Sequence, residues 1–379
     1  MFRWQVLVGG ALGVLGGLSV LSLAGNGEHR PQASGPILSE CDGHLRELVM
    51  HYEPAASEIV LPVYRDFLRA LGNDVQVDVV CPGPAAFRDL VSKLGRVNCR
   101  LRALPVNHPI TTWSRDRWVA LAPASAQAPS TLWSPRAEAG DAVWPGRAGD
   151  ERVGEDVAVA LSPRVAARRS SLFFDGGDFL ADSQNVFVMP RVLPRNNQHT
   201  ITNRQELVRM LTAELKRPVR LLAEAPDHHA GMFMASVGGR VMLMGDPSLA
   251  RPFVTTTSRS GLSPEFMDLP GGADFTPETQ HRFDAVASEC AALGYRVWRI
   301  PVVPAIDGRT YLTYVNVLMD RQGERHTVYL PFYRGVEGLN AAARDVWEKL
   351  GFEVVPVDCT SVYRHFGCLH CLVNVLRRS

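Results

Sequence analysis

The sequence lacks several features that mark common functional classes. Its formal net charge is only +1, and its 40 Lys and Arg and 39 Asp and Glu form no block of like charge. This pattern argues against nucleic acid or an anionic membrane surface as the partner. No second Cys-x-x-Cys and no His-x-x-x-His accompanies Cys368 and Cys371, so the usual tetrahedral zinc set is incomplete. With 46% hydrophobic residues among 379, a large globular core remains.

One long apolar run lies at the N-terminus. A single cation, Arg3, precedes the uncharged run Val6–Ala24, which ends in small residues as signal peptides do. The run is also long enough to span a bilayer core of about 30 Å. No Cys follows it closely, which excludes a lipoprotein anchor. We therefore expect residues 1–24 to be a signal peptide, or alternatively an uncleaved anchor, and residues 25–38 to be a linker. The protein is then secreted or periplasmic, or held at the membrane by that N-terminal helix.

Seven cysteines in an exported chain permit up to three disulfides and leave one thiol over. The stretch Cys368-Leu-His-Cys371 is one candidate for a redox dithiol. Thioredoxin-type pairs lie at a helix N-terminus, whose dipole lowers the thiol pKa. The β-branched residues after Cys371 instead predict a strand, so a thiol-disulfide oxidoreductase is the weaker hypothesis, and a regulatory disulfide between the two thiols remains open.

One local pattern occurs five times along the chain. An amphipathic helical stretch reaches a stop, usually Leu-Gly, and a β-branched strand follows. The copies occupy residues 67–83, 90–106, 211–226, 289–304 and 346–360. Helix-Gly-strand is the ordinary unit of any α/β protein, but four of these copies are followed directly by chemically reactive side chains. Because ligand sites form where such strands end, the pattern predicts an α/β fold whose repeats assemble one site.

Residues 122–165 interrupt this pattern. Their composition shifts to Ala, Pro, Ser, Gly and Arg with weak periodicity, which predicts a surface insertion with little regular structure. The chain then reaches Asp175-Gly176-Gly177-Asp178, where the glycines permit a tight turn and close approach of a ligand. A solvated hairpin turn is the alternative interpretation of this motif.

The reactive stretches together suggest one chemistry. A thiolate that attacks a planar, cationic carbon requires a cysteine, a proton-shuttling histidine, carboxylates that hold the cation, and an orienting polar group. Four different repeats supply this set as Cys371, His229, Asp116 and Asn316. Neighbouring strand residues point to opposite faces, so we expect only one of His228 and His229 to serve the site.

These motifs resemble a known family. From about His51 to the C-terminus, outside the insertion, the chain is similar to the guanidino-group hydrolases of the pentein superfamily, in the branch of agmatine deiminases and bacterial peptidylarginine deiminases. The segments that carry the resemblance are Trp113-x-Arg115-Asp116, Phe174-Asp175-Gly176-Gly177, Tyr314-x-Asn316 and Gly367-x-x-His370-Cys371. The resemblance implies a pentein α/β propeller, with pseudo-fivefold ββαβ-type repeats around a central channel, in one catalytic domain over residues 39–379.

The resemblance also implies a reaction. The guanidinium of agmatine, or of arginine in peptides, is hydrolysed to a ureido group with release of ammonia, and no metal or organic cofactor takes part. Cys371 is the implied nucleophile and His229 the proton shuttle. The implied substrate-binding residues are Asp116, Asn316, Asp175, Asp178 and Trp113. The only partner expected is the guanidino compound or peptidyl-arginine substrate.

The chain departs from the family pattern at one position. The family's His-x-Asp is replaced by His229-Ala230-Gly231, so the second guanidinium-binding carboxylate is missing. Loss of one partner from a desolvated charge pair costs about 2 to 5 kcal/mol. The alternative hypothesis is therefore a catalytically impaired homologue that binds a cationic ligand, with Asp227 or Asp178 as possible compensating carboxylates. Under that hypothesis, Gly231→Asp should raise activity.

Overall fold

The computed structural model describes residues 34–138, 147–259 and 269–379, without the side chains of 255–259. Residues Ser34–Ser379 form one compact unit. The predicted signal peptide or anchor lies outside the described residues, as does most of the predicted linker. Among the helices that are described, none is long and apolar enough to cross a membrane.

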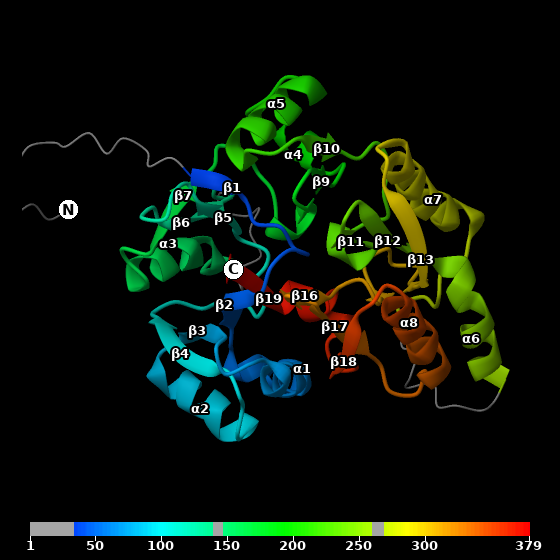
Figure 1. Ribbon diagram of the computed structural model, residues 1–379, viewed down its shortest axis with the longest axis horizontal. Coiled ribbons are helices and arrows are strands. Elements are labelled where there is room, and N and C mark those ends of the chain that lie inside the picture. Colours follow the sequence, from blue (N-terminus) through cyan, green and yellow to red (C-terminus); the bar gives the residue numbers. More distant parts are fainter. Residues whose placement is uncertain (1–33, 139–146, 260–268) are drawn as a thin grey trace, which may run out of the picture. The chain divides into compact units, whose positions relative to one another are not determined.

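The unit contains five sheets built on one plan (Figure 1). In each, two strands pair antiparallel, the chain then passes through one or more helices, and the next strand pairs parallel to the second. We call each such set a ββαβ unit. The first unit comprises β5 (Val119–Pro123), β6 (Ser130–Ser134), α3 (Asp150–Ala160) and β7 (Val165–Arg169).

Three further units follow in chain order. The second comprises β8 (Phe179–Ala181), β9 (Val186–Val188), α4 (Val192–Asn196), α5 (Arg204–Leu215) and β10 (Val219–Leu221). The third comprises β11 (Met234–Gly238), β12 (Val241–Asp246), α6 (Pro247–Arg259), α7 (Pro277–Ala292) and β13 (Arg296–Pro301). The fourth comprises β16 (Leu318–Gln322), β17 (Arg325–Phe332), α8 (Glu337–Lys349) and β18 (Glu353–Asp358).

The fifth unit joins the two ends of the described chain. Its antiparallel pair combines the last strand with an early one, and Val373 lies opposite Met50. It comprises β19 (Val373–Arg378), β2 (Leu45–His51), α1 (Ser57–Ala70), β3 (Gln76–Pro82), α2 (Pro84–Leu94) and β4 (Arg100–Val106). Strand β1 (Ser34–Ile37) pairs with β5, so the last residues of the predicted linker belong to a sheet.

The remaining elements are short. Strands β14 (Val303–Pro304) and β15 (Tyr311–Leu312) form a two-stranded pair. The short helices are η1 (Pro54–Ala56), η4 (Gly176–Asp178), η5 (Ala230–Met232), η7 (Tyr363–His365) and α9 (Leu369–Leu372). Three of them, η4, η5 and α9, carry or follow the candidate catalytic residues.

All five predicted helix-strand copies are confirmed, as α1–β3, α2–β4, α5–β10, α7–β13 and α8–β18. The five copies do not correspond one to one to the five units, because the first two copies belong to the same sheet. The uncounted unit lies in residues 122–165, where β6 and α3 replace the expected irregular insertion. Val153 and Val157, four residues apart on α3, are buried with Trp118. Only two large apolar side chains face the core from this helix, so its periodicity was hard to detect.

Neighbouring sheets touch one another but do not merge in the described part of the chain. Contacts join β19 to β5, β2 to β16, α8 to β13, β11 to β8, and α5 to β1. Figure 1 shows α2, α3, α5 and α7 outside the strands of their own units. The loops at the ends of these strands are therefore free to meet one another.

Candidate active site

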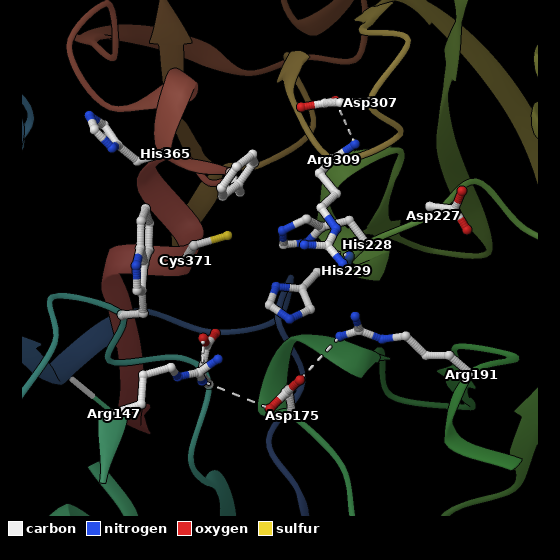
Figure 2. Close-up of a pocket in the computed structure, with 13 residues that line it drawn as sticks. Arg147, Asp175, Arg191, Asp227, His228, His229, Asp307, Arg309, His365 and Cys371 are labelled. Atoms are coloured by element: carbon white, nitrogen blue, oxygen red, sulfur yellow. Dashed lines mark hydrogen bonds and ion pairs between the residues drawn. The ribbon is translucent and has the colours of Figure 1, made fainter. Parts of the chain in front are cut away.

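One cavity of about 640 Å³ collects residues from several units (Figure 2). Asp116 follows β4, His229 follows β10, and Cys371 precedes β19. The residues that line the cavity are Trp113, Asp116, Arg147, Asp175, Arg191, Asp227, His228, His229, Asp307, Arg309, His365, Phe366 and Cys371. The structure therefore brings five of the seven predicted site residues to one space: Cys371, His229, Asp116, Asp175 and Trp113.

Cys371 lies in the four-residue helix α9, immediately before β19. The predicted strand after this cysteine is thus confirmed. Burial raises the pKa of the Cys371 thiol to about 12, so the free protein carries a thiol at neutral pH. Figure 2 shows its sulfur pointing into the cavity toward His228 and His229. A bound cation would favour the thiolate at this position.

Asn316 lies beneath the nucleophile and does not line the cavity. Its Nδ2 donates to Cys371 Sγ at 3.4 Å and to the Gly231 carbonyl at 3.1 Å. Its Oδ1 accepts a hydrogen bond from the His370 backbone N–H at 2.9 Å. In this structure the amide thus bonds to the segment that carries the sulfur, and its contact with a substrate stays a prediction.

His229 is almost completely buried against the glycine turn. A Cβ atom on Gly177 would lie 2.5 Å from Cγ of the imidazole, so the ring needs a glycine at this position. Burial lowers the pKa of His229 well below its usual value, and the neighbouring His228 and Arg191 act in the same direction. Its Nδ1 is buried with no hydrogen bond partner in the described part of the chain. A neutral imidazole with a vacant nitrogen can accept a proton.

His228 lies in the same cavity, contrary to the expectation that only one of the pair could. The two residues are not in a strand: His228 has φ +79, in the left-handed region. Its Nδ1 accepts the backbone N–H of His229 at 2.8 Å, and the two rings are perpendicular with centroids 4.4 Å apart. Burial, assisted by Arg191, lowers the pKa of His228 to about 4. A strained backbone thus turns both imidazoles to one side.

Asp116, whose carboxylate is predicted to bind the substrate cation, is buried. Burial raises the pKa of Asp116 to about 7, and the Arg147 guanidinium opposes this rise. Arg147 Nη2 lies 2.8 Å from Asp116 Oδ2. Asp116 is therefore charged only in part near neutral pH, and an additional cation would complete its ionisation.

Asp175 also lines the cavity, within a cluster of guanidinium groups. Although burial acts to raise its pKa, the surrounding arginines lower it below the usual value; they are Arg195, Arg191, Arg147 and Arg117. The Asp-Gly-Gly-Asp motif forms the buried turn η4, so the solvated hairpin interpretation is wrong. Asp178 does not line the cavity, and its carboxylate caps the turn by accepting the Asp175 backbone N–H at 2.8 Å; its contact with a substrate stays a prediction.

Two aromatic residues flank the sulfur side of the cavity. A Cβ atom on Gly367 would lie 2.5 Å from Cζ3 of Trp113, so the glycine of the Gly-x-x-His-Cys segment admits the indole ring. Phe366 has φ +68 and is 43% exposed at the cavity. Flat rings of this kind suit a planar guanidinium.

Backbone hydrogen bonds tie the motifs together. The Arg115 N–H donates to the Cys371 carbonyl at 3.3 Å, and the Gly176 N–H donates to the Asp116 carbonyl at 2.6 Å. The Arg115 side chain pairs with Glu40, not with the adjacent Asp116. The carboxylate of Asp116 faces the cavity instead, where Arg147 binds it.

Gly231 does not line the cavity. A Cβ atom there would lie 3.1 Å from His370 Nδ1 and 3.3 Å from Asn316 Nδ2, beneath the nucleophile. Of the two carboxylates considered as replacements, Asp178 is a cap, and Asp227 lies at the rim, 66% exposed and paired with Arg282 at 3.1 Å. Besides Asp116, the acidic residues that line the cavity are Asp175, Asp227 and Asp307.

The two cysteines of the Cys-x-x-Cys stretch have separate environments. Cys368 Sγ lies 3.1 Å from the Tyr333 hydroxyl, whereas Cys371 Sγ contacts Asn316. All seven cysteines are described, and all are free. Among the described residues, no group of three or more His, Cys, Asp or Glu could hold a metal ion.

Sequence reasoning missed several cavity residues: Arg147, Arg191, His228, Asp307, Arg309, His365 and Phe366. Arg147 belongs to the segment whose composition suggested an insertion. Arg309 does follow the fourth helix-strand copy, and the nearby polar residues Asp307 and Tyr311 could have indicated that this loop contributes to the site. Neither residue belongs to a recognised motif.

Neither a family model nor a curated protein sequence matches the chain. Solved structures do match the chain. An agmatine deiminase of C. jejuni has 14% identity and a TM-score of 0.64, with 91% of this chain and 96% of that chain covered. An agmatine deiminase of Enterococcus faecalis has 13% identity and a TM-score of 0.65, with 92% and 99% covered. The chain therefore has the α/β fold of these proteins over nearly its whole described length.

Proposed function

We propose that the protein is a cysteine-dependent hydrolase that converts a guanidinium group to a ureido group and ammonia. One observation carries this proposal: Cys371, His229 and Asp116, brought from distant parts of the chain, line a single cavity. A nucleophile, a neutral proton acceptor and a buried carboxylate are the groups that this reaction requires.

The proposed reaction has two stages. The thiol proton passes to His229, the sulfur attacks the central guanidinium carbon, and a carbon–sulfur bond forms. His229 then returns the proton to the departing nitrogen, the carbon–nitrogen bond breaks, and ammonia leaves. Water attacks the resulting thiouronium, assisted by His229, and the carbon–sulfur bond breaks to give the ureido product and the thiol.

Electrostatics link substrate binding to activation of the sulfur. In the free protein, burial raises the pKa of both the Cys371 thiol and the Asp116 carboxyl. A guanidinium stays protonated at any ordinary pH. When it enters the cavity, its charge favours the ionised form of both groups. The substrate itself thus supplies the cation that stabilises the thiolate.

The matched structures support this assignment. They include two agmatine deiminases and a cysteine-to-serine variant of the C. jejuni enzyme with substrate bound. Another is described as a candidate peptidyl-arginine deiminase, with 13% identity and a TM-score of 0.65. By analogy with this fold, the five ββαβ units are proposed to form a pentein propeller around a central channel.

Export is a separate proposal that rests on the sequence of residues 1–24. Cleavage after this segment would release the protein, whereas retention would anchor it. N-terminal sequencing of protein from the producing cells, combined with separation of membrane and soluble fractions, tests both forms. Full-length protein recovered only from the cytoplasm contradicts both.

The activity is tested with the full chain and a panel containing agmatine, arginine and arginine-containing peptides. Ammonia and ureido product should appear in equal amounts, and Cys371→Ala should abolish both. Cys99→Ala is the matched control, because Cys99 is a buried cysteine remote from the cavity. Equal product from wild type and Cys371→Ala rejects the proposal. Ligand binding without any product favours the impaired homologue instead.

A further inference from the structure

Arg309 enters the cavity on the side away from Arg147 (Figure 2). It belongs to the loop between β14 and β15, residues 305–310. Figure 2 shows its side chain extending from this loop toward His228. The cavity thus has a cationic group on the side opposite the one where Arg147 and Asp175 meet.

Arg309 differs from Arg147 and Arg191 because its guanidinium is not in close contact with a carboxylate, although its charge acts on the neighbouring Asp307. Arg147 is bound to Asp116 at 2.8 Å, and Arg191 is bound to Asp178 at 2.5 Å. In the described part of the chain, by contrast, the Arg309 guanidinium makes no hydrogen bond or ion pair. Arg309 is exposed, so its guanidinium donors are open to solvent and are available to an acceptor on a ligand.

The acidic residues beside Arg309 are already engaged. Asp307 accepts the backbone N–H groups of Arg309 and Thr310 at 2.9 and 2.8 Å, and the Thr310 hydroxyl at 2.7 Å. Asp227 pairs with Arg282 at 3.1 Å. These two carboxylates lie near the subsite, but the hydrogen bonds and ion pair of their oxygens do not involve the Arg309 side chain.

His228 supplies a second donor on the same side. Because its Nδ1 accepts the His229 backbone N–H, its hydrogen in the neutral form lies on Nε2. The left-handed backbone of His228, with φ +79, is the strained conformation that directs this ring into the cavity. Arg309 and His228 together offer donors of the kind that bind a carboxylate.

We infer that Arg309 and His228 form a carboxylate-binding subsite, so that the substrate carries a carboxylate at the end opposite its guanidinium. This inference rests on the proposed function and names its substrate class. Free arginine and arginine at the C-terminus of a peptide share this chemistry. Agmatine has the amino group of arginine but lacks the carboxylate, so Arg309 would gain no acceptor and would repel the ammonium group.

The space around the subsite is large enough for free arginine or for a peptide that ends in arginine. The cavity of about 640 Å³ is within the range of small-molecule sites. A second hollow of about 330 Å³ adjoins it, and Asp227 and Asp307 line both. The remainder of a peptide can extend through this second hollow, while free arginine needs only the first.

Binding is measured by calorimetry on the full chain carrying Cys371→Ala, with arginine, argininamide and agmatine as probes. Arginine should bind more tightly than argininamide, on the order of tenfold to a hundredfold, as expected for hydrogen bonds to a charged group. Adding Arg309→Ala should remove this difference, and Arg309→Glu should favour agmatine. Arg325→Ala, at an exposed arginine paired with Glu353, is the matched control and should preserve the difference.

Each result bears on the inference independently of turnover. Equal affinity for arginine and argininamide, or a difference that survives Arg309→Ala, overturns the carboxylate subsite even if the protein is an active deiminase. A difference abolished only by Arg309 substitutions supports the subsite even if no product forms. A peptide ending in arginine, with its C-terminal amide as the control, then shows which molecule supplies the carboxylate. Tighter binding of the peptide than of free arginine identifies a peptide C-terminus, and tighter binding of free arginine identifies the amino acid.

Discussion

The guanidinium of Arg147 lies 2.8 Å from the carboxylate of Asp116, inside the candidate active site. The same guanidinium lies 3.9 Å from Asp175. A cation from the chain itself therefore partly neutralises the carboxylates that the substrate is expected to meet. The ionisation of Asp116 then depends on this arginine as well as on the substrate.

Arg147 is expected to set the pH dependence of kcat/KM. Because the pKa of Asp116 is about 7, kcat/KM should rise with pH through about 7 as the carboxylate ionises. Arg147→Ala removes a cation that lowers this pKa, so the rise should move to higher pH by about one unit or more. Arg136→Ala is the control, since Arg136 lies over the Phe173 ring. An unshifted profile in Arg147→Ala would falsify this coupling.

Asn316→Ala should lower kcat more than it raises KM. The substitution leaves the buried carbonyl of Gly231 without its side-chain donor and removes an acceptor from the His370 N–H. We expect a loss of stability of about 1 to 3 kcal/mol, the cost of unsatisfied buried groups. Thermal unfolding and steady-state kinetics together measure both effects. A pure KM effect would indicate that Asn316 contacts the substrate after all.

Gly177→Ala should displace His229. The added methyl group would lie 2.5 Å from the imidazole Cγ, closer than the two atoms can pack. We expect overpacking to cost about 1 to 3 kcal/mol and kcat to fall because the proton acceptor moves. Gly72→Ala is the control, because its Cβ meets only the flexible Asp74 carboxylate. Wild-type kcat in Gly177→Ala would show that the turn does not hold the histidine.

Gly231→Asp should not raise activity, in contrast to the expectation from the family pattern. The new Cβ lies 3.1 Å from His370 and 3.3 Å from Asn316, so the carboxylate must share the space that positions the nucleophile. We expect a lower kcat and a loss of about 1 to 3 kcal/mol in stability. A large gain in kcat/KM would instead restore the hypothesis of an impaired homologue.

Local sequence predicted local structure well. The five helix-strand copies exist, and the β-branched residues after Cys371 form β19. The motifs around Asp116, Asp175 and Cys371 also reach one cavity, and each lies in a segment that connects two strands. The prediction failed for α3, where few large apolar residues mark the buried face.

Tertiary structure decided which motif residues touch the cavity. Asp178 has the same carboxylate as Asp175, but it binds the Asp175 backbone. Asn316 has an amide that could bind a substrate, but this amide contacts the Cys371 sulfur. Spacing along the chain cannot distinguish these roles, since they depend on which way a buried turn directs each side chain.

The sequence by itself determined the repeating helix-strand units and the set of reactive residues, because periodicity and turn residues act over a few positions. Only the tertiary structure decided that Arg147, His228 and Arg309 join them. Their positions follow from packing between units and from the left-handed backbone at His228. Such contacts join residues far apart in the chain, and no local pattern encodes them.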